Sequence, residues 1–446
     1  MKKITLLAIG LLSMNAFSQE YFSAITTSKR VGILNGHLNP SEFANLNSKF
    51  EVQVFNFSIN TSNNKVGFSD LTKGENIEKM IFDGKSNVNF DINTAIFGPS
   101  FAMRQGKWGF GISTKAFIKA SIIDLDSDLG NALINNQLNS AIGIASVFSS
   151  ENQRVTSTTW GEMGFSAART VYETETHQIN AGITLKLLFP GSYANMGLNN
   201  FRGDIVNTVN GLELTNTNAT LNIAYSGSLG SNFGNTSDYF KSLFGGLDGM
   251  ATDIGVDYQW LNSDKKYKLK VGASVRNIGS MTFSGNDNVS QNYNLNIPTG
   301  QSLNLDVFND AEGLQDVQTI LNNSGYFTTT NLTNEFKVKL PTVFNIYADY
   351  KIISKVSVTA FLQQKMGDQA SDGQISTQNM FTITPRVNLG PFEAFIPMGN
   401  NEIAGGTVGL GFRLGGFFLG SNSILSAIAT DSKQADAYFG FRFGFL

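Results

Sequence analysis

The chain has 446 residues and a net charge of -3, with 15% charged residues, 41% hydrophobic residues, 45 glycines, 36 phenylalanines and no cysteine. The scattered lysines and arginines exclude the basic footprint of a nucleic-acid-binding protein, and the missing cysteines exclude disulfides, thiol catalysis and thiolate metal sites. The many aromatic residues and glycines are typical of a protein built from strands and turns.

The N-terminus has the pattern of an export signal. Two lysines precede an apolar run at 4–14, and the sequence AFS at 16–18 fits a small-x-small cleavage site. We therefore predict that residues 1–18 are a signal peptide, which is cleaved before Gln19. The apolar run is too short for a membrane anchor, and nothing later reaches the roughly 18 uninterrupted apolar residues of a transmembrane helix. The exported chain is then a periplasmic or secreted protein, or a β-barrel of the outer membrane.

Residues 29–46, KRVGILNGHLNPSEFANL, differ in pattern from the rest of the chain. They show no alternation and contain Gly32, Gly36 and Pro40, so we predict irregular, turn-rich backbone. In a membrane barrel such backbone is tolerated only where it is buried in protein or lines a cavity. We therefore predict that residues 19–49 form a plug inside a barrel that comprises residues 50–446.

Along the predicted barrel, apolar residues recur at every second position. In the segment 177–188, apolar side chains such as Ile183 and Leu185 alternate with polar ones such as Thr184 and Lys186. Alternate side chains of a strand point to opposite faces, so such a segment has one apolar and one polar face. Strands of about ten residues with this pattern fit a tilted crossing of a bilayer. The same pattern occurs at 108–117, 268–277 and 356–365.

The connections between these strands fall into two lengths, as in outer-membrane barrels with short turns at one end and long loops at the other. At roughly 30 residues per strand with its connection, we predict about 14 strands. Between 190 and 250 the strand count needs one more crossing than the pattern supplies. The spacing of Leu and Ile within 122–148 predicts a short amphipathic helix at the rim. Short turns are predicted at 105–107, 173–176, 262–266 and 351–355, and long polar connections at 61–87, 121–158 and 280–334.

The chain ends with the strand AYFGFRFGFL, residues 437–446. One face of this strand carries Phe439, Phe441, Phe443 and Phe445, and the other carries Tyr438, Gly440, Arg442 and Gly444. In a soluble β-sandwich the aromatic row would face a core, whereas in a membrane barrel it would face lipid. Because a chain rarely finishes on its most hydrophobic core strand, we predict that the row faces lipid and that this strand closes the barrel against the first one.

Several short motifs carry a resemblance to a known family. LNPSEFANL resembles the N-P-A-x-x-A start of the hatch in the long-chain fatty-acid transporter (FadL-like) superfamily, with Asn39 and Pro40 in place and Ser41 where Ala is usual. VGASVRNIGS, with Gly272, Asn277 and Gly279, is similar to a strand end of that superfamily. KLPTVFNIYADYKIISKVSVTAFLQQ and INAGITLKLLFPGSY are similar to barrel strands of the same group, which includes PorV-type barrels of type IX secretion.

This resemblance implies a barrel of about 14 strands with an N-terminal plug, whose motif residues are Asn39 and Pro40. It implies either passage of hydrophobic molecules or docking to a secretion machine. The final strand resembles the C-terminal signal that the outer-membrane assembly machinery recognises, although Leu446 stands where an aromatic residue is usual. The residues of that signal are Phe439, Phe441, Phe443 and Phe445.

Catalytic and metal chemistry finds little support in the sequence. A Ser-His-Asp hydrolase needs a histidine, but His177 is on the apolar row of a strand and His37 is in the proposed plug. Asp124, Asp126 and Asp128 imitate the start of a calcium loop, yet the glycine is one position late, at 130, and the twelfth position is Asn instead of Glu. We therefore predict structural histidines, a solvated acidic loop, no catalytic residue, no metal site and no cofactor.

Together these patterns predict an all-β protein, a transmembrane antiparallel barrel in the outer membrane of a Gram-negative bacterium, surrounded by lipid. The leading hypothesis is a non-enzymatic barrel that binds small hydrophobic or amphipathic molecules or passes them across the membrane. The alternative is an accessory barrel that docks to a larger envelope complex, such as a secretion or assembly machine. The sequence leaves the ligand, the partner, the oligomeric state and the openness of the lumen undetermined.

Overall fold

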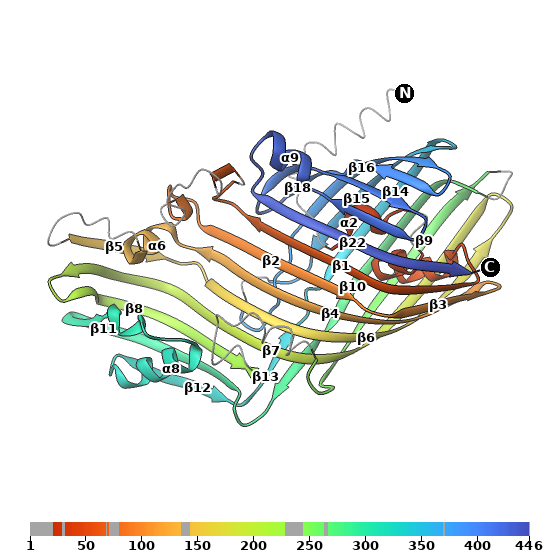
Figure 1. Cartoon of the computed structure of the whole chain (residues 1–446). Coiled ribbons are helices and arrows are strands. Elements are labelled where there is room, and N and C mark those ends of the chain that lie inside the picture. The colour runs from red at the N-terminus through yellow and green to blue at the C-terminus, as the bar shows by residue number, and fades with distance from the viewer. Residues whose placement is uncertain are drawn as a thin grey trace.

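The computed structural model describes residues 21–28, 32–67, 69–70, 80–134, 143–227, 244–262, 266–368 and 371–445. Over these residues the chain forms one antiparallel sheet of 22 strand segments that closes on itself (Figure 1). The segments are β1 (Phe50–Asn63), β2 (Val88–Phe97), β3 (Ser100–Gln105), β4 (Trp108–Leu125), β5 (Gly143–Ser149), β6 (Gln153–Glu173), β7 (His177–Thr208), β8 (Gly211–Ser226), β9 (Gly249–Leu261), β10 (Tyr267–Ser284), β11 (Val289–Asn304), β12 (Phe327–Thr333), β13 (Glu335–Lys339), β14 (Val343–Ile353), β15 (Val356–Lys365), β16 (Met380–Leu389), β17 (Phe392–Phe395), β18 (Met398–Asn401), β19 (Gly405–Val408), β20 (Leu410–Leu414), β21 (Phe417–Ser421) and β22 (Gln434–Phe445).

The helices of the described residues are short, with four to ten residues each. None of those in the described part of the chain has both the length and the apolar character that a membrane crossing requires. They are α2 (Ser23–Thr26), α3 (Ile33–Leu38), the 3-10 helix η1 (Pro40–Asn45), α6 (Ser127–Ile134), the 3-10 helix η3 (Leu305–Phe308), α8 (Leu314–Asn323) and α9 (Ile424–Ala429).

Many of the segments are pieces of longer strands. For example, β2 and β3 are separated at Gly98 and Pro99, yet both pair with β1 on one side and with β4 on the other. Counted in this way, the wall consists of 14 strands, and β22 pairs with β1 to close it. The prediction of an antiparallel barrel of about 14 strands is therefore confirmed.

Between residues 190 and 250, where the predicted strand count was one crossing short, the described residues belong to a tall hairpin. β7 is one strand of 32 residues. Its first part, up to Leu187, pairs with β9, and its second part, from Tyr193, pairs with β8. β8 and β9 run in the same direction, so they are two halves of one crossing. The described residues thus contain no further crossing there, and residues 228–243 lie outside the described residues.

The prediction of a long polar loop at 280–334 is wrong. This stretch contains β11, η3, α8 and β12, and β11 pairs with both β8 and β12. With β5 and the upper part of β7, these strands project beyond the rest of the barrel (Figure 1), and we call them the apical sheet. One face of the apical sheet is covered by α6 and α8, through residues such as Leu129, Leu314 and Leu321. Because that face is covered by protein, these strands do not need the continuous apolar row of a lipid-facing strand. Their sequence therefore resembles that of a polar loop.

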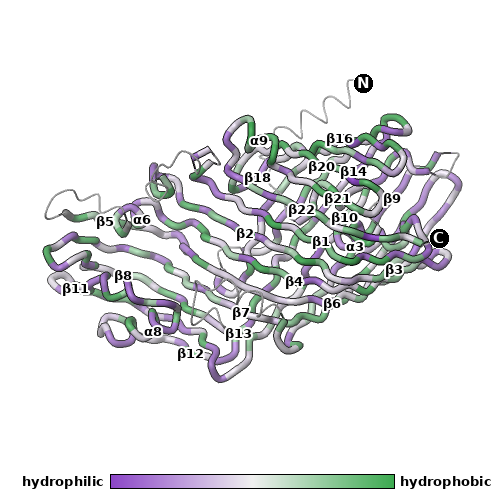
Figure 2. Tube along the Cα trace, viewed as in Figure 1, coloured by the Kyte–Doolittle hydropathy of each residue, from purple (hydrophilic) through white to green (hydrophobic). Residues whose placement is uncertain are grey.

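The strands of the wall have the predicted two faces. Hydrophobic and hydrophilic residues alternate along them (Figure 2). On β7, Ile183 and Leu185 are exposed on the outside, whereas Thr184 and Lys186 are buried in the lumen. The four phenylalanines of β22, Phe439 to Phe445, are 37–54% exposed, while Tyr438 on the opposite face is fully buried. The outside of the barrel is therefore apolar, and the polar row faces inward.

Candidate functional site in the barrel lumen

The N-terminal residues 21–28 and 32–46, which we call the lumenal segment, lie inside the barrel (Figure 1). All residues of α2 and α3 are buried. Phe22 packs against the rings of Phe97 and Tyr438, which belong to opposite sides of the wall closure. The segment therefore fills the lumen at the end where β1 begins and where the short turns lie.

Asn39 and Pro40 pack directly against two glycines of the wall, Gly182 and Gly255, which we call the glycine seat. Gly182 on β7 and Gly255 on β9 are directly paired across the two strands. A Cβ atom on Gly182 would lie 2.5 Å from the carbonyl carbon of Pro40, and one on Gly255 would lie 2.0 Å from Oδ1 of Asn39. The same Oδ1 accepts a hydrogen bond from the backbone N–H of Ser41 (3.1 Å), which caps η1. Both glycines are thus required for this close approach; the role of Asn39 and Pro40 as a plug motif stays a prediction.

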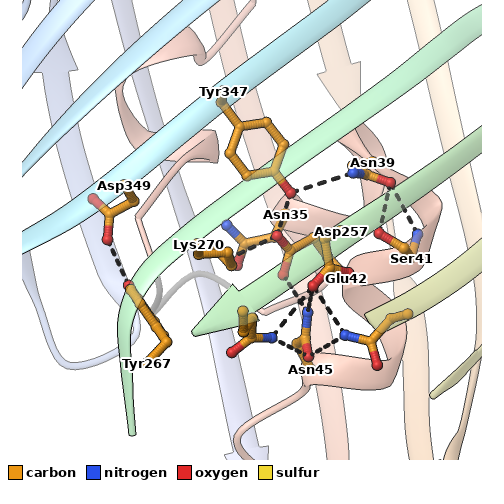
Figure 3. A network of polar contacts seen from close by, with 12 residues as sticks. Asn35, Asn39, Ser41, Glu42, Asn45, Asp257, Tyr267, Lys270, Tyr347 and Asp349 are labelled. Carbon is orange, nitrogen blue, oxygen red and sulfur yellow. Dashed lines mark hydrogen bonds and ion pairs between the residues drawn. The ribbon is translucent and has the colours of Figure 1, made fainter. Parts of the chain in front are cut away.

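A buried ion pair ties η1 to the wall (Figure 3). The Nζ atom of Lys270 lies 2.7 Å from Oε1 of Glu42, and the hydroxyl of Tyr347 donates a hydrogen bond to the same oxygen. Burial alone would raise the pKa of Glu42, but Lys270, helped by hydrogen bonds from Tyr347 and Asn45, holds the pKa of Glu42 below its usual value. Glu42 is therefore ionised at neutral pH.

Asn45 extends this network around the lumen (Figure 3). Its Nδ2 atom donates to Oδ1 of Asp257 (3.0 Å), and its Oδ1 accepts from Nε2 of Gln259 (2.7 Å) and Nδ2 of Asn180 (2.9 Å). One amide at the end of η1 thus bonds to both β7 and β9.

A second anchor holds the start of the lumenal segment against β16 and β17. Arg386 on β16 donates to Oγ1 of Thr27 (2.7 Å) and forms an ion pair with Glu393 on β17 (3.4 Å). Glu393 in turn accepts a hydrogen bond from the hydroxyl of Ser28 (3.0 Å) and lies 3.2 Å from Arg413. These contacts and the Glu42 network hold the segment at two separate places.

A small space, the central chamber, remains between the lumenal segment and the wall. Its volume is about 40 Å³, and aromatic rings and charged groups line it together. Lys186 forms ion pairs in the chamber with Asp253 (2.8 Å) and Glu162 (3.7 Å). The aromatic residues at the chamber are Tyr21, Phe97, Phe117, Trp160 and Phe361.

The long-loop end of the lumen is also covered. Residues 371–379, which connect β15 to β16, fold into the barrel, and we call them the inner loop. Nζ of Lys119 donates to the backbone carbonyl of Ser376 (3.1 Å), and Arg154 donates to that of Gln374 (3.2 Å). Above the inner loop lies a vestibule of about 560 Å³ that is lined by both polar and apolar residues. The lumen is thus covered from both ends.

An apolar pocket of about 330 Å³ lies at the same rim. Its wall residues Phe90 and Ile122 are on the outward rows of β2 and β4, because their sequence neighbours Asp91 and Ser121 face the lumen. Ala435 on β22 is exposed, next to the buried Gln434. Phe90 and Ile122 also line the vestibule. The outside of the wall and the vestibule therefore meet at this point. Residues 65–67 and 81 also line the pocket.

The two histidines lie where the sequence placed them. His177 is exposed at the start of β7, and its Nδ1 atom lies 2.7 Å from the hydroxyl of Tyr258. His37 is buried in α3 and lines the central chamber. Burial lowers the pKa of His37 well below its usual value, and the cations Lys115, Lys186 and Arg276 lower it further.

The acidic loop at 124–128 builds the start of a helix. Oδ1 of Asp126 accepts the N–H groups of Asp128 and Leu129, both at 2.9 Å, and so caps α6. Asp124 instead accepts a hydrogen bond from Asn89 (3.1 Å). The three carboxylates do not converge, and the described residues contain no cluster of three or more side chains suited to a metal. α6 is the short helix predicted within 122–148.

Asn277 has a positive φ of 62° at a bulge of β10. Its Oδ1 atom accepts a hydrogen bond from Lys186 (2.6 Å), which places this residue of the family-like strand end beside the central chamber. The sequence did not identify the chamber residues Lys115, Lys119 and Lys186. These lysines could have been noticed as full positive charges on the inward rows of strands. Such a position shows that a side chain points into the lumen, but not which group it contacts there.

Comparisons with known proteins give one family and several distant structures. A search of the curated proteins finds no significant match. The chain is similar to a TodX monoaromatic hydrocarbon channel mutant (9% identity, covering 92% of this chain and 93% of that one, TM-score 0.46) and to the P. putida toluene transporter TodX (8%, 91% and 92%, TM-score 0.44). It is also similar to the CymD monoaromatic hydrocarbon channel (11%, 93% and 94%, TM-score 0.41). A family model, "Family of unknown function (DUF5723)", matches residues 43–422. Because this match covers most of the chain, the protein belongs to the DUF5723 family.

Proposed function

We propose that this protein is an outer-membrane barrel that binds small hydrophobic or amphipathic molecules and passes them inward. In this proposal residues 1–18 direct export, and the assembly machinery recognises the row from Phe439 to Phe445. The short turns face the periplasm and the long loops face outward, as in outer-membrane barrels generally. The lumenal segment acts as the plug, with Asn39 and Pro40 at its seat.

The observation that supports this function best is the apolar pocket at the rim. It lies on the outer side of the wall, where an apolar molecule in the outer leaflet would reach it, and it shares Phe90 and Ile122 with the vestibule. Apolar pockets with a few polar groups at their edge are typical of small-molecule sites. A ligand would therefore pass from the lipid side to the lumen side over these two residues.

Passage beyond the vestibule requires movement of the chain. The inner loop is held by Lys119 and Arg154, and the lumenal segment by Glu42 and Arg386. Each of these contacts joins a strand of the wall to the inner loop or to the lumenal segment, the two parts that would have to move. A ligand would wait in the pocket or vestibule until the inner loop and then the lumenal segment shifted.

Uptake of the fluorescent apolar probe N-phenyl-1-naphthylamine tests the proposal. Gram-negative cells with an intact lipopolysaccharide layer, expressing the chain, should take up the probe several-fold faster than cells without it. Phe90→Asp, which puts a charge into the pocket, should remove this gain. Leu332→Asp, an equivalent change on the exposed face of the apical sheet, should not. Uptake equal to that of cells without the protein would refute the transport function.

The apical sheet favours a second candidate, an accessory barrel docked to an envelope complex. On β5, Ile144 and Phe148 are 64% and 72% exposed, on the face opposite the buried Val147. Large exposed apolar side chains on a projecting sheet suit a protein interface. A stoichiometric partner that copurifies in mild detergent, and is lost after Phe148→Asp, would support this candidate over transport.

A further inference from the structure

Lys115 is a buried cation whose ammonium group has no polar contact. It points inward from β4, and the residue is 6% exposed. It forms no hydrogen bond or ion pair with the described residues, and its Nζ atom lies 5.1 Å from the centroid of the Phe97 ring. Buried charges are normally paired, because an unpaired one is poorly solvated. A bound anion in contact with the ammonium group would therefore stabilise the buried charge of Lys115.

The nearest carboxylates are already used by other groups. Glu162 is the cross-strand neighbour of Lys115. However, one of its oxygens accepts a hydrogen bond from Nε1 of Trp160 (3.1 Å), and the other is paired with Lys186 at 3.7 Å. Asp253 lies 2.8 Å from the same Lys186. Four cations, Lys115, Lys119, Lys186 and Arg276, thus line the chamber, whereas the only carboxylate among its described lining residues is Glu162, and the nearby Asp253 is paired with Lys186.

A second polar group in the chamber has no partner. Nε2 of His37 is buried and makes no hydrogen bond, and the residue is 7% exposed. Because burial and the neighbouring cations lower the pKa of His37, its ring is neutral and carries one N–H. In the tautomer with hydrogen on Nε2, this atom is a donor that lacks an acceptor.

The chamber has room for a small acceptor. Its volume of about 40 Å³ corresponds to a few water molecules, at about 10–15 Å³ each on this measure. That space suits a small oxyanion but not a hydrocarbon chain. Lys115, His37 and Trp160 are buried around it, and burial strengthens a charge–charge contact.

We propose that the central chamber is a binding site for a small oxyanion of the carboxylate or phosphate class, held by the Lys115 ammonium and by the Nε2–H of His37. The anion is either a free small ion or the anionic head of an amphipathic molecule. In the second case the proposal rests on the proposed function, because such a molecule would reach the chamber by the route above.

Trp160 provides a local reporter for this site. It lines the chamber, whereas the other two tryptophans of the chain, Trp108 and Trp260, are exposed on the outer face. In the Trp108→Phe/Trp260→Phe double variant, fluorescence therefore reports on the chamber alone. The purified barrel in detergent would be titrated with acetate, inorganic phosphate, octanoate and, as the uncharged counterpart, octanol, at constant ionic strength.

We expect a saturable fluorescence change with acetate or phosphate. Lys115→Met in the same background should weaken this binding at least tenfold, whereas Lys107→Met, an exposed lysine at a short turn, should leave it unchanged. His37→Phe should weaken it, and His37→Gln, which keeps a donor, should restore part of the loss. The histidine pair keeps the test decisive if Lys115→Met does not fold.

The four probes separate the two sources. Saturable binding of acetate or phosphate identifies a free anion, and binding of octanoate without acetate, phosphate or octanol identifies an anionic head group. No saturable response to any of the anions, or equal binding by Lys115→Met, would overturn the site. Failure of naphthylamine uptake would leave acetate binding intact, so the two proposals fail separately.

Discussion

The wall and the lumen of this barrel are specified in different ways. The outer face repeats one simple rule, an apolar residue at every second position, so Ile183 and Ile254 are neighbours with the same environment. The lumen depends on individual pairings, such as Glu42 with Lys270, between residues more than 200 positions apart. A change on the wall is therefore expected to act through lipid contact, and a change in the lumen through the loss of one particular partner.

The largest effect is expected from Glu42→Leu. It leaves Lys270 buried without its partner, which costs about 3–5 kcal/mol. Because the contact joins the lumenal segment to β10, this cost should appear as release of the segment, measured by protease cleavage within residues 32–46 of the folded barrel. The double variant Glu42→Leu/Lys270→Met removes both charges and should recover much of the protection. Equal cleavage of the single and double variants would contradict the ion-pair explanation.

A somewhat smaller effect is expected on the wall from Ile183→Lys. A lysine at the middle of a lipid-facing strand costs about 2–4 kcal/mol. The measurement is the urea midpoint of the barrel in lipid vesicles, followed by the heat-modifiable gel band. Ile183→Val is the matched control and should stay near the parent. An unchanged midpoint for Ile183→Lys would mean that this row does not face lipid.

The glycine seat should respond to Gly182→Ala. The added Cβ meets the backbone of Pro40, and overpacking of this kind costs about 1–3 kcal/mol. We expect faster protease cleavage of the lumenal segment with little change in the barrel itself. Gly246→Ala, where a Cβ would meet nothing within 4 Å, is the control. A seat that accepted alanine without loss would show that Pro40 is not held against β7.

The smallest effect is the pH dependence due to His37. Its pKa is lowered by burial in the folded state, so the unfolded chain binds a proton more readily. The contribution to stability is complete above the usual pKa of about 6.5 and falls as the pH drops below it, by at most about 1.4 kcal/mol per pH unit. Unfolding midpoints at pH 7 and 5 should therefore differ more for the parent than for His37→Gln. Equal differences would show that His37 is accessible to protons when folded.

The sequence predicted the parts of this fold that follow from neighbouring positions. The two faces of β7, the aromatic row of β22 and the short turns all result from a period of two or from turn residues, which are local properties. The apical sheet was missed because helices cover it, so its strands carry a polar pattern without the lipid-facing row. The inner loop was missed for a related reason: Gln374 and Ser376 read as solvated residues until the barrel closes around them.

The site was less predictable than the wall. Asn39 and Pro40 were found through a short motif, but the glycines beneath them are more than 140 positions away and belong to different strands. The charges of Lys115 and Lys270 were visible on inward rows, but alternation specifies only which face a side chain occupies. Which acid, amide or empty space it meets depends on the stagger of 14 strands around the closed wall.

The length of β7 has a consequence for what the cell surface presents. At about 3.3 Å per residue, its 32 residues extend over roughly 105 Å, and at a tilt of about 40° they rise roughly 80 Å. The hydrocarbon core is only about 30 Å thick. In the proposed orientation, more than half of this strand therefore stands among and above the sugar chains of the outer leaflet. An antibody, a phage or a neighbouring cell would touch the apical sheet, to which this part of β7 belongs, before it reached the membrane-embedded wall.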